Sequence, residues 1–242
     1  MTNIKNTLRG LALLGTSTKI FRPQNVFKNK RVAVIGAADS AFENEMGSYI
    51  DDFDLVVRVN KAPHSLSREK FKFLGSRTDV LFHSFYENKE SGGGPIDFEL
   101  YEKQGIKFIV NPNFNKKGLI THLNYYKRNL NNKTTYFLSR AFYDQITANF
   151  GKVIPTVGYY ALITLLKSEC KEIYISGFTF FKTPYANDYR DHLLDMKENQ
   201  KHIKKQGIHD PDLEFSLFKK ELEKTNCSKV LMDRTLTAIL NP

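Results

Sequence analysis

Two histidines, His192 and His209, stand where an imidazole could accept a proton from a hydroxyl group. Each lies at the expected start of a helix, with Asp195 one turn after His192 and Asp210-Pro211 directly after His209. The positive end of a helix dipole disfavours the imidazolium form, so the ring stays neutral and basic near pH 7. A neutral imidazole suits a general base that removes a proton from a hydroxyl group. An exposed histidine without a chemical role is the commoner outcome of this pattern, so both residues are candidates at this point.

A glycine turn follows the first strongly apolar run of the chain and is a candidate phosphate-binding site. The run ends in Gly36-Ala37-Ala38-Asp39-Ser40, and a helix is expected to follow it. A strand, a small-residue turn and a helix start present unpaired backbone N–H groups to an anion at the carboxyl edge of an α/β sheet. The dinucleotide-binding and P-loop glycine patterns are both absent from this turn. A purely structural turn explains the residues equally well.

Further polar positions are expected at the same edge of the sheet. Asn60 follows the apolar run at residues 55–59, and its amide could bond to a base, a ribose or a phosphate. Thr156 and Gly158 open an apolar helix after Pro155, which also suits contact with a phosphate or a ribose. The alternatives are a turn asparagine and a helix-capping threonine. On the local pattern alone, these structural interpretations are favoured.

Two motifs are assigned no chemical role. Asp52-Phe53-Asp54 has the Asp-x-Asp form with which many nucleotide-sugar transferases hold Mg²⁺ or Mn²⁺, because carboxylate oxygens suit these hard cations. This motif precedes its strand, however, so it should lie at the opposite edge of the sheet, as a solvated turn. Gly92-Gly93-Gly94 could cradle a phosphate, but a mobile loop is the better interpretation of a glycine run. The sequence therefore predicts no metal site and no cofactor.

These candidates need an α/β scaffold, which the alternation of apolar runs with helix-length segments predicts. The expected fold class is a single-domain α/β/α sandwich with a mostly parallel sheet. The predicted strands are Val32–Ile35, Leu55–Val59, Asp79–Phe82, Lys107–Val110, Thr135–Leu138, Glu172–Ser176 and Val230–Met232. The predicted helices are Pro95–Gln104, Leu119–Leu130, Tyr159–Leu166, Asp188–Lys204 and one that Asp210 caps, with Pro211 in its first position.

The positive charge of the chain is concentrated at its N-terminus. The 242 residues have a formal net charge of +10, from 36 Lys+Arg and 26 Asp+Glu. Residues 1–31 hold seven of the basic residues and no acidic residue, so the rest of the chain is close to neutral. We therefore expect a basic arm over residues 1–30, able to bind an anionic membrane surface, and a domain over residues 31–242. Nucleic-acid binding is a minor alternative, because the domain has no basic stripe with interleaved aromatic residues.

Composition and cysteine content indicate a globular protein made without export. Apolar residues make up 41% and charged residues 26% of the chain, which excludes collagen-like and largely disordered proteins. Two cysteines, Cys170 and Cys227, are too few for a disulfide framework. No apolar run approaches the roughly 18 residues of a membrane span, and no convincing signal peptide is present. The expected location is the cytoplasm, with the arm at the inner face of the membrane.

Taken in order, these signals resemble the four sialylmotifs of glycosyltransferase family 29, the sialyltransferases. Residues 32–63, which include Val-Val-Arg-Val-Asn-Lys-Ala-Pro, resemble the long motif. Residues 155–178, with Pro-Thr-Val-Gly and Ile-Ser-Gly-Phe, resemble the small motif. His192-Leu193-Leu194-Asp195 resembles the third motif, and residues 207–214 are similar to the very small motif, in which Glu214 follows His209. No single motif is specific, but four in order over residues 31–223 are a strong indication.

The resemblance implies an inverting, metal-independent transfer from a CMP-activated acidic sugar, on a GT-A-like α/β fold. His209 would be the general base for the acceptor hydroxyl, and His192 would contact the donor phosphate and help the CMP to leave. Glu214 would hold the segment that carries His209. The donor-binding residues would be Gly36, Ser40, Asn60, Thr156 and Gly158.

Three departures from the family pattern bear on these expectations. Ala37 stands where the family usually has asparagine, so Ser40 or the backbone would replace one contact to CMP. Val157 stands where a hydroxyl residue is usual. Cys170 fits one position of the disulfide found in some family members, but Val32 occupies the other, so that bond cannot form. A bacterial or viral relative is therefore expected, and not a Golgi enzyme.

The expected function is transfer of a sialic acid-like sugar from its CMP donor to a hydroxyl of a surface glycan, such as lipopolysaccharide or capsule. Kdo, a related acidic 2-keto sugar that is also CMP-activated, is the alternative donor sugar. A non-catalytic protein that binds a CMP-sugar or nucleic acid is the alternative from another class. The expected partners are a CMP-sugar donor, a glycan or glycolipid acceptor and, for the arm, an anionic membrane.

Overall fold

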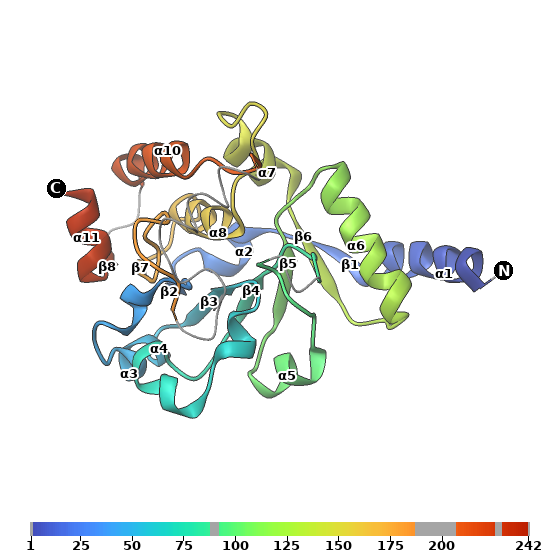
Figure 1. Cartoon of the computed structure of the whole chain (residues 1–242), viewed down its shortest axis with the longest axis horizontal. Coiled ribbons are helices and arrows are strands. Elements are labelled where there is room, and N and C mark those ends of the chain that lie inside the picture. Colours follow the sequence, from blue (N-terminus) through green and yellow to red (C-terminus); the bar gives the residue numbers. More distant parts are fainter. Residues whose placement is uncertain (1, 88–91, 187–206, 226–228, 242) are drawn as a thin grey trace.

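The computed structural model describes residues 2–87, 92–186, 207–225 and 229–241. Strands from this part of the chain form one eight-stranded sheet, in which every bonded pair of neighbours runs parallel (Figure 1). The strands are β1 (Thr18–Phe21), β2 (Arg31–Ile35), β3 (Leu55–Val59), β4 (Val80–Phe82), β5 (Phe108–Asn111), β6 (Thr135–Leu138), β7 (Glu172–Ser176) and β8 (Val230–Met232). Their order across the sheet is β1-β6-β5-β4-β3-β2-β7-β8.

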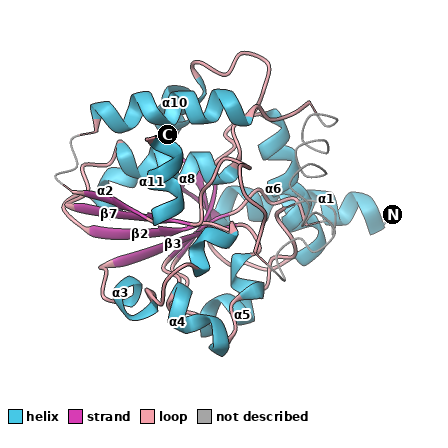
Figure 2. Ribbon diagram, turned by 60° about the vertical axis from the view of Figure 1, so that its left-hand side comes forward, coloured by secondary structure: helices cyan, strands magenta, loops and turns pink. Residues whose placement is uncertain are grey.

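Helices cover both faces of this sheet (Figure 2). They are α1 (Thr2–Ser17), α2 (Pro23–Phe27), α3 (Gly47–Asp51), α4 (Phe71–Leu74), α5 (Phe98–Lys103), α6 (Lys116–Asn129), α7 (Arg140–Thr147), α8 (Val157–Leu166), α10 (Pro211–Lys224) and α11 (Arg234–Leu240). One face packs against α2, α7, α8, α10 and α11. The other face is covered by α3 and α4 over the β2–β3 region and by α1, α5 and α6 over the β4–β5 region.

Strand β2 shows why the central strands read as continuous apolar runs. Val32 and Val34 point into the core on the α8 side, and Ala33 and Ile35 point into the core on the α3 side. Because successive side chains of a strand face opposite ways, a strand covered on both faces needs apolar residues at every position. This arrangement confirms the predicted α/β sandwich with a parallel sheet.

The predicted strands are confirmed, each with its ends shifted by at most one residue. The helix predicted to begin at Leu119 begins earlier, at Lys116, because Asn115 caps it by accepting a hydrogen bond from the Gly118 N–H. The predicted cap at Asp210 is confirmed, with Pro211 in the first turn of α10. After Gly36 the chain forms a short 3₁₀ helix, Asp39–Phe42, in place of the expected α-helix. The helix predicted at Asp188–Lys204 lies outside the described residues.

The first 30 residues, expected as an arm, contribute a helix and a strand to the fold. Strand β1 pairs in parallel with β6, and the Phe21 side chain at its end is 1% exposed. The Phe21 ring contacts those of Phe27, Phe82 and Phe108 edge-to-face. The boundary expected at Lys30 therefore falls inside the sheet-forming part of the chain. Within the residues described, no helix combines the length and hydropathy needed to cross a bilayer.

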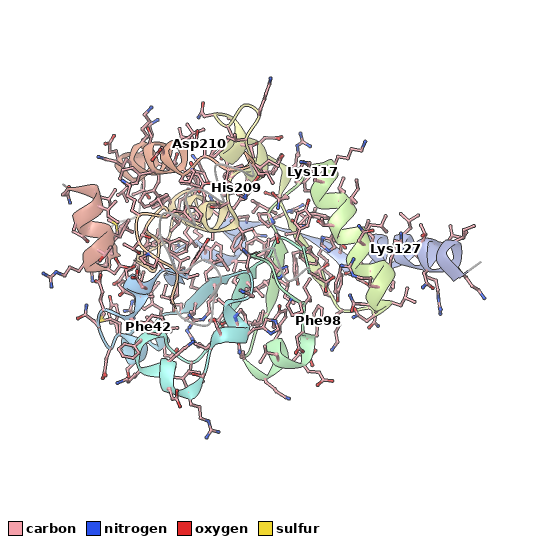
Figure 3. The ribbon with its side chains drawn as sticks, viewed as in Figure 1. Phe42, Phe98, Lys117, Lys127, His209 and Asp210 are labelled. Carbon is pink, nitrogen blue, oxygen red and sulfur yellow. The ribbon has the colours of Figure 1, made fainter. Side chains whose placement is uncertain are left out.

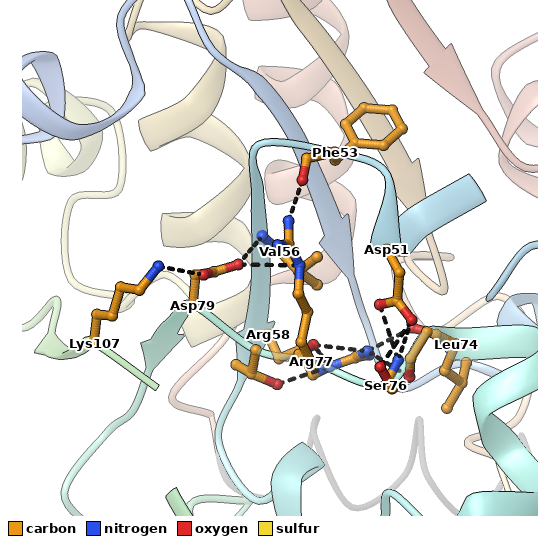
Figure 4. Close-up of polar contacts among 11 residues, drawn as sticks. Asp51, Phe53, Val56, Arg58, Leu74, Ser76, Arg77, Asp79 and Lys107 are labelled. Atoms are coloured by element: carbon orange, nitrogen blue, oxygen red, sulfur yellow. Dashed lines mark hydrogen bonds and ion pairs between the residues drawn. The ribbon is translucent and has the colours of Figure 1, made fainter. Parts of the chain in front are cut away.

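A buried arginine ties β3 to the loop before β4 (Figure 4). The Arg58 side chain is 1% exposed and donates to the carbonyl oxygen of Leu74 at 2.5 Å and to that of Gly75 at 3.2 Å. A third bond runs from Arg58 Nε to Thr78 Oγ1, at 3.0 Å. Burial lowers the pKa of Arg58 to about 10, because the charged guanidinium is removed from water. These bonds fix the strand whose end carries Asn60.

Candidate active site

The carboxyl ends of the central strands surround a cavity of about 400 Å³. Its wall is built by the loops that follow β2, β3, β4, β5 and β7, and by the first turns of α6, α8 and α10. The chain leaves β2 towards β3 on one side, and β7 lies on the other side, so the strand order reverses at this place. Open α/β sheets bind their ligands in the crevice at such a reversal. The cavity is therefore the candidate active site.

The cavity brings together most of the site residues that the sequence predicted. Those on its wall are Asn60, Thr156, Gly158, His209 and Glu214. Gly36 and Ser40 lie behind the wall, and His192 lies outside the described residues. The residues on the wall come from the end of β3 and from the starts of α8 and α10.

Asn60 is held in place by its own backbone and side chain. Its φ of 51° is in the left-handed region, which asparagine adopts more readily than most residues. Its backbone N–H donates to the Phe82 carbonyl oxygen at 2.7 Å, and its Oδ1 accepts from the Ser84 N–H at 3.1 Å. With Oδ1 bonded to the protein, the Nδ2 group is the part of the amide that can donate to a ligand.

Thr156 joins the start of α8 to α10. Its hydroxyl accepts from the Tyr159 N–H at 3.1 Å, which makes Thr156 the N-cap of α8. The same hydroxyl donates to Glu214 Oε2 at 2.8 Å, and the Thr156 backbone N–H donates to Glu214 Oε1 at 2.7 Å. Thr156 therefore both caps α8 and lies at the cavity, as expected. The Glu214 carboxyl group holds it in position.

The Glu214 carboxyl group sits in an environment that favours its protonated form. The side chain is 2% exposed. Burial raises the pKa of Glu214 to about 8, and the nearby charge of Asp210 acts in the same direction, while the two hydrogen bonds from Thr156 oppose them. At neutral pH the group is therefore largely uncharged, although it lies at the wall of the cavity.

The start of α8 faces the cavity through Val157 and Gly158. The first backbone N–H groups of a helix lack partners within the helix, and with the helix dipole they favour an anion. A Cβ atom at Gly158 would come within 3.1 Å of the Phe178 ring, so the glycine allows this ring to pack beside the helix start. The resulting surface, part apolar and part N–H donor, suits a phosphate group with an attached nucleoside.

His209 lies beside the start of α10, where Figure 3 labels it next to Asp210. Its Nδ1 is 2.6 Å from the Ile154 carbonyl oxygen, and the Ile154 N–H donates to the Ile208 carbonyl oxygen at 2.8 Å. A carbonyl oxygen can only accept, so the proton of the neutral ring is on Nδ1. The lone pair is then on Nε2, which is the arrangement that a general base needs.

Gly36 and Ser40 support the wall from behind and do not form part of it. A Cβ atom at Gly36 would come within 2.1 Å of the Gly177 carbonyl oxygen, so glycine is needed for the close approach of these two turns. Ser40 donates to Asp233 Oδ2 at 3.0 Å, and the Gly177 N–H donates to the same oxygen at 2.7 Å. The residues between them, Ala37 and Ala38, are the ones that reach the wall.

Several wall residues were missed by the sequence analysis. They are Ser84, Tyr86, Asn113, Asn115, Lys117, Thr179, Thr183 and Tyr185. Gly92 and Gly93 also line the cavity, although a mobile loop was favoured for them over a phosphate cradle. The segment from Asn111 to Asn115 carried a usable signal, because its polar residues follow an apolar strand as Asn60 does. Thr179, Thr183 and Tyr185, which follow β7, gave no sequence signal that distinguishes them from residues of an ordinary loop.

Asp52 and Asp54 lie at the opposite edge of the sheet, as predicted. They precede β3, and Asp54 Oδ2 accepts from the Arg31 N–H at 2.8 Å while Asp52 Oδ2 lies 2.9 Å from Arg31 Nη1. They therefore bind the first residue of β2 from the amino ends of the strands. Across the described parts of the chain, no three His, Cys, Asp or Glu side chains gather in a way that could hold a metal ion.

A family model matches nearly the whole chain. The model for glycosyltransferase family 29 (sialyltransferase) covers residues 2–227. It includes the strands, helices and loops that form the cavity, and it also includes α1 and β1. A comparison with curated protein sequences gives no match.

Solved structures with the same fold include sialyltransferases from distant organisms. A mammalian sialyltransferase is 18% identical with a TM-score of 0.58, and the alignment covers 93% of this chain and 78% of that chain. The sialyltransferase CstII from Campylobacter jejuni, solved with the substrate analogue CMP-3FNeuAc, is 18% identical with a TM-score of 0.51, covering 86% of this chain and 83% of that chain. At these identities the structures confirm the GT-A-like fold. With the family model, they identify the chain as a member of glycosyltransferase family 29, the sialyltransferases, and as a CMP-sugar-dependent glycosyltransferase.

Proposed function

We propose that this enzyme transfers sialic acid from CMP-sialic acid to a hydroxyl group of a glycan, with inversion at the anomeric carbon. One observation carries the proposal: a helix start suited to phosphate and a histidine with a fixed tautomer lie on the same cavity wall. The Ile154 carbonyl oxygen connects the two features. It accepts a hydrogen bond from His209, and Ile154 lies two residues before Thr156, the N-cap of α8. A base and a leaving-group site in one cavity are what a direct displacement requires.

In the proposed reaction, His209 Nε2 takes the proton of the acceptor hydroxyl as its oxygen attacks the anomeric carbon. The bond between that carbon and the phosphate breaks on the opposite face, and CMP leaves with the electron pair. The N–H groups at the start of α8 stabilise the negative charge that develops on the phosphate. A single displacement of this kind inverts the configuration of the anomeric carbon. His192 as a second phosphate contact stays a prediction.

The structures of relatives support the choice of substrates. CstII was solved with CMP-3FNeuAc, and a single-residue variant of the same enzyme, 19% identical to this chain with a TM-score of 0.52, was solved with CMP. A mammalian sialyltransferase, 17% identical with a TM-score of 0.56, was solved with Gal-beta-1-3GalNAc-ortho-nitrophenol. By extension, we propose CMP-sialic acid as the donor here and a surface glycan, such as lipopolysaccharide or capsule, as the acceptor.

The donor is tested by following the release of CMP from CMP-sialic acid and from CMP-Kdo, with and without a galactoside acceptor. We expect release from CMP-sialic acid that depends on the protein and increases with the acceptor. Release from CMP-Kdo alone would replace sialic acid by Kdo as the transferred sugar. If CMP is bound but neither donor is turned over, the protein is a CMP-sugar-binding protein and the catalytic proposal is wrong.

A second part of the proposal concerns α1 as a contact with an anionic membrane. Ile4, Leu8 and Leu11 are 70%, 63% and 48% exposed, and their spacing places them along one side of the helix. Lys5 and Arg9 are located on the same helix, and the chain holds no acidic residue before Asp39. An apolar side flanked by positive charges is typical of a helix that lies on an anionic lipid surface. Such a contact would bring a lipid-linked acceptor to the enzyme at the cytoplasmic face.

Charge reversal tests this contact better than deletion, because removal of the first 31 residues would also remove β1. The double variant Lys5→Glu, Arg9→Glu is expected to bind anionic liposomes at least tenfold more weakly, since each basic residue contributes about 1 kcal/mol at such a surface. The control is Lys220→Glu, Lys224→Glu, a pair with the same spacing on α10, at the far end of the molecule from α1 (Figure 1). Equal binding by the two double variants would exclude α1 as the lipid contact.

A further inference from the structure

The described wall of the cavity contains one lysine or arginine side chain, that of Lys117. Lys117 is the second residue of α6 and is exposed. Within the residues that the structure describes, its ammonium group has no hydrogen bond or ion pair to the protein. A positive charge that faces a cavity without a protein partner is available to an anionic ligand. The proposed substrates carry such groups, since the donor has a phosphate and its sugar has a carboxylate.

The position of Lys117 separates it from the proposed phosphate site. Lys117 follows β5, which lies three strands from β2 and four strands from β7 in the sheet. At about 4.8 Å between neighbouring strands, these separations correspond to roughly 14–19 Å. The start of α8 packs at the other side of the cavity, where Gly158 lies against Phe178 after β7. Figure 3 labels Lys117 at the start of α6 and His209 beside the start of α10. Lys117 therefore lies away from the proposed phosphate site, on the β5 side of the cavity.

Asn113, on the same part of the wall, provides a second and independent sign of a ligand. Its Oδ1 atom is buried and has no hydrogen-bond partner within the described structure. A buried acceptor left unsatisfied costs about 1–3 kcal/mol, so such atoms are normally bonded when the site is occupied. A sugar hydroxyl or an N-acetyl N–H is a donor of the right kind.

The segment that carries both residues is firmly built. The Asn111 side chain is fully buried, donates from Nδ2 to the Gly118 carbonyl oxygen at 3.2 Å and accepts at Oδ1 from the Asn113 N–H at 3.0 Å. Gly118 packs so closely that a Cβ atom would come within 1.8 Å of the Asn113 carbonyl oxygen. The start of α6 is thereby locked onto the end of β5, which keeps Asn113 and Lys117 in a fixed relation.

We propose that Lys117 and Asn113 form a subsite for an acidic sugar, in which Lys117 pairs with the sugar carboxylate and Asn113 Oδ1 accepts a hydroxyl or amide proton. The proposal rests on the proposed function, because it names the part of the substrate that this end of the cavity binds. The carboxylate belongs either to the donor sugar or to an acidic sugar at the end of the acceptor. Either source makes Lys117 a specificity-determining residue for an anionic sugar.

The test compares Lys117→Gln with Lys116→Gln, a neighbouring exposed lysine of α6 that does not reach the wall. Binding of CMP and of CMP-3FNeuAc is measured by calorimetry, and KM is measured with lactose and with sialyllactose as acceptors. We expect Lys117→Gln to bind CMP as the wild type does and to bind the acidic sugar about ten- to a hundredfold more weakly, the usual effect of losing a charge-assisted hydrogen bond. Lys117→Arg, which keeps the charge, should restore most of the affinity.

The four ligands distinguish the two sources of the carboxylate. Weaker binding of CMP-3FNeuAc, with a raised donor KM for both acceptors, assigns the subsite to the donor sugar. A raised KM for sialyllactose, with no comparable rise for lactose, assigns it to the acceptor. If Lys117→Gln matches Lys116→Gln in every measurement while the wild type binds CMP, the subsite is wrong and the proposed function stands. A wild type that binds neither CMP nor CMP-3FNeuAc overturns both.

Discussion

His209→Ala is expected to slow sialyl transfer by about 10²–10⁴-fold, the contribution usual for a general base. The expectation follows from the bond of 2.6 Å between Nδ1 and the Ile154 carbonyl oxygen, which places the proton of the neutral ring on Nδ1 and the lone pair on Nε2. Binding of CMP should change little, because the start of α8 and Asn60 are untouched. The rate is measured as release of CMP in the presence of acceptor, and the affinity for CMP is measured by calorimetry.

His64→Ala is the matched control for this variant. His64 is exposed and also bonds to a backbone carbonyl oxygen, with Nε2 at 2.9 Å from that of Pro95, but it is not part of the cavity wall. We expect it to keep wild-type turnover. Turnover by His209→Ala within a few-fold of the control would show that another group accepts the proton. Loss of CMP binding together with turnover would instead assign His209 to the structure of the donor site.

The sequence predicted the strands that position this site where both faces of the strand are buried. The strands β2, β3, β4 and β7 each hold at least three consecutive apolar residues, so each gives a continuous local signal. Strand β1 gives no such signal, because it lies at the edge of the sheet and only Phe21 of its residues is fully buried. Its lysine and threonine made the segment look like part of a charged arm.

The sequence predicted the place of a site residue only where that residue directly follows an apolar strand or lies at the start of a helix. Asn60, Thr156 and His209 each lie where an apolar run ends or a helix begins, and their place at the carboxyl edge follows from the parallel sheet. Ser40 has its role through Asp233, which is 193 positions away, and no local pattern indicates such a pairing. Ser40 was expected to contact the ligand. It lies behind the cavity wall instead, because it bonds to Asp233.

The effect of Glu214→Gln on the free energy of unfolding is expected to be about 2 kcal/mol more favourable at pH 8 than at pH 6. Burial raises the pKa of Glu214 from 4.5 to about 8, so between these values the folded chain holds a proton that the unfolded chain has lost. The stability from this proton is fully present below pH 4.5 and is lost as the pH rises towards 8, at roughly 1.4 kcal/mol per pH unit. Glutamine does not titrate, and its Oε1 can still accept from the Thr156 N–H.

The free energies of unfolding are obtained from urea titrations at several pH values between 6 and 8. Glu223→Gln is the control, since Glu223 is an exposed residue of the same helix. We expect the wild type and Glu223→Gln to lose stability in parallel as the pH rises, and Glu214→Gln to lose less. Three parallel curves would contradict the raised pKa. Glu214→Ala should be destabilised at every pH, by about 2–4 kcal/mol, because it leaves a void and an unpaired Thr156 N–H.

The same proton should control the affinity for CMP. When Glu214 ionises, a negative charge appears beside Thr156, the N-cap of the helix whose start is proposed to hold the phosphate. Like charges in a partly desolvated site repel strongly, so CMP binding by the wild type should weaken several-fold between pH 7 and pH 9. Glu214→Gln should retain its affinity over this range, measured by calorimetry in parallel with the wild type. An equal loss by both proteins would place the titrating group elsewhere. A loss confined to the wild type would show that the buried carboxyl group must stay protonated for the helix start to hold a phosphate.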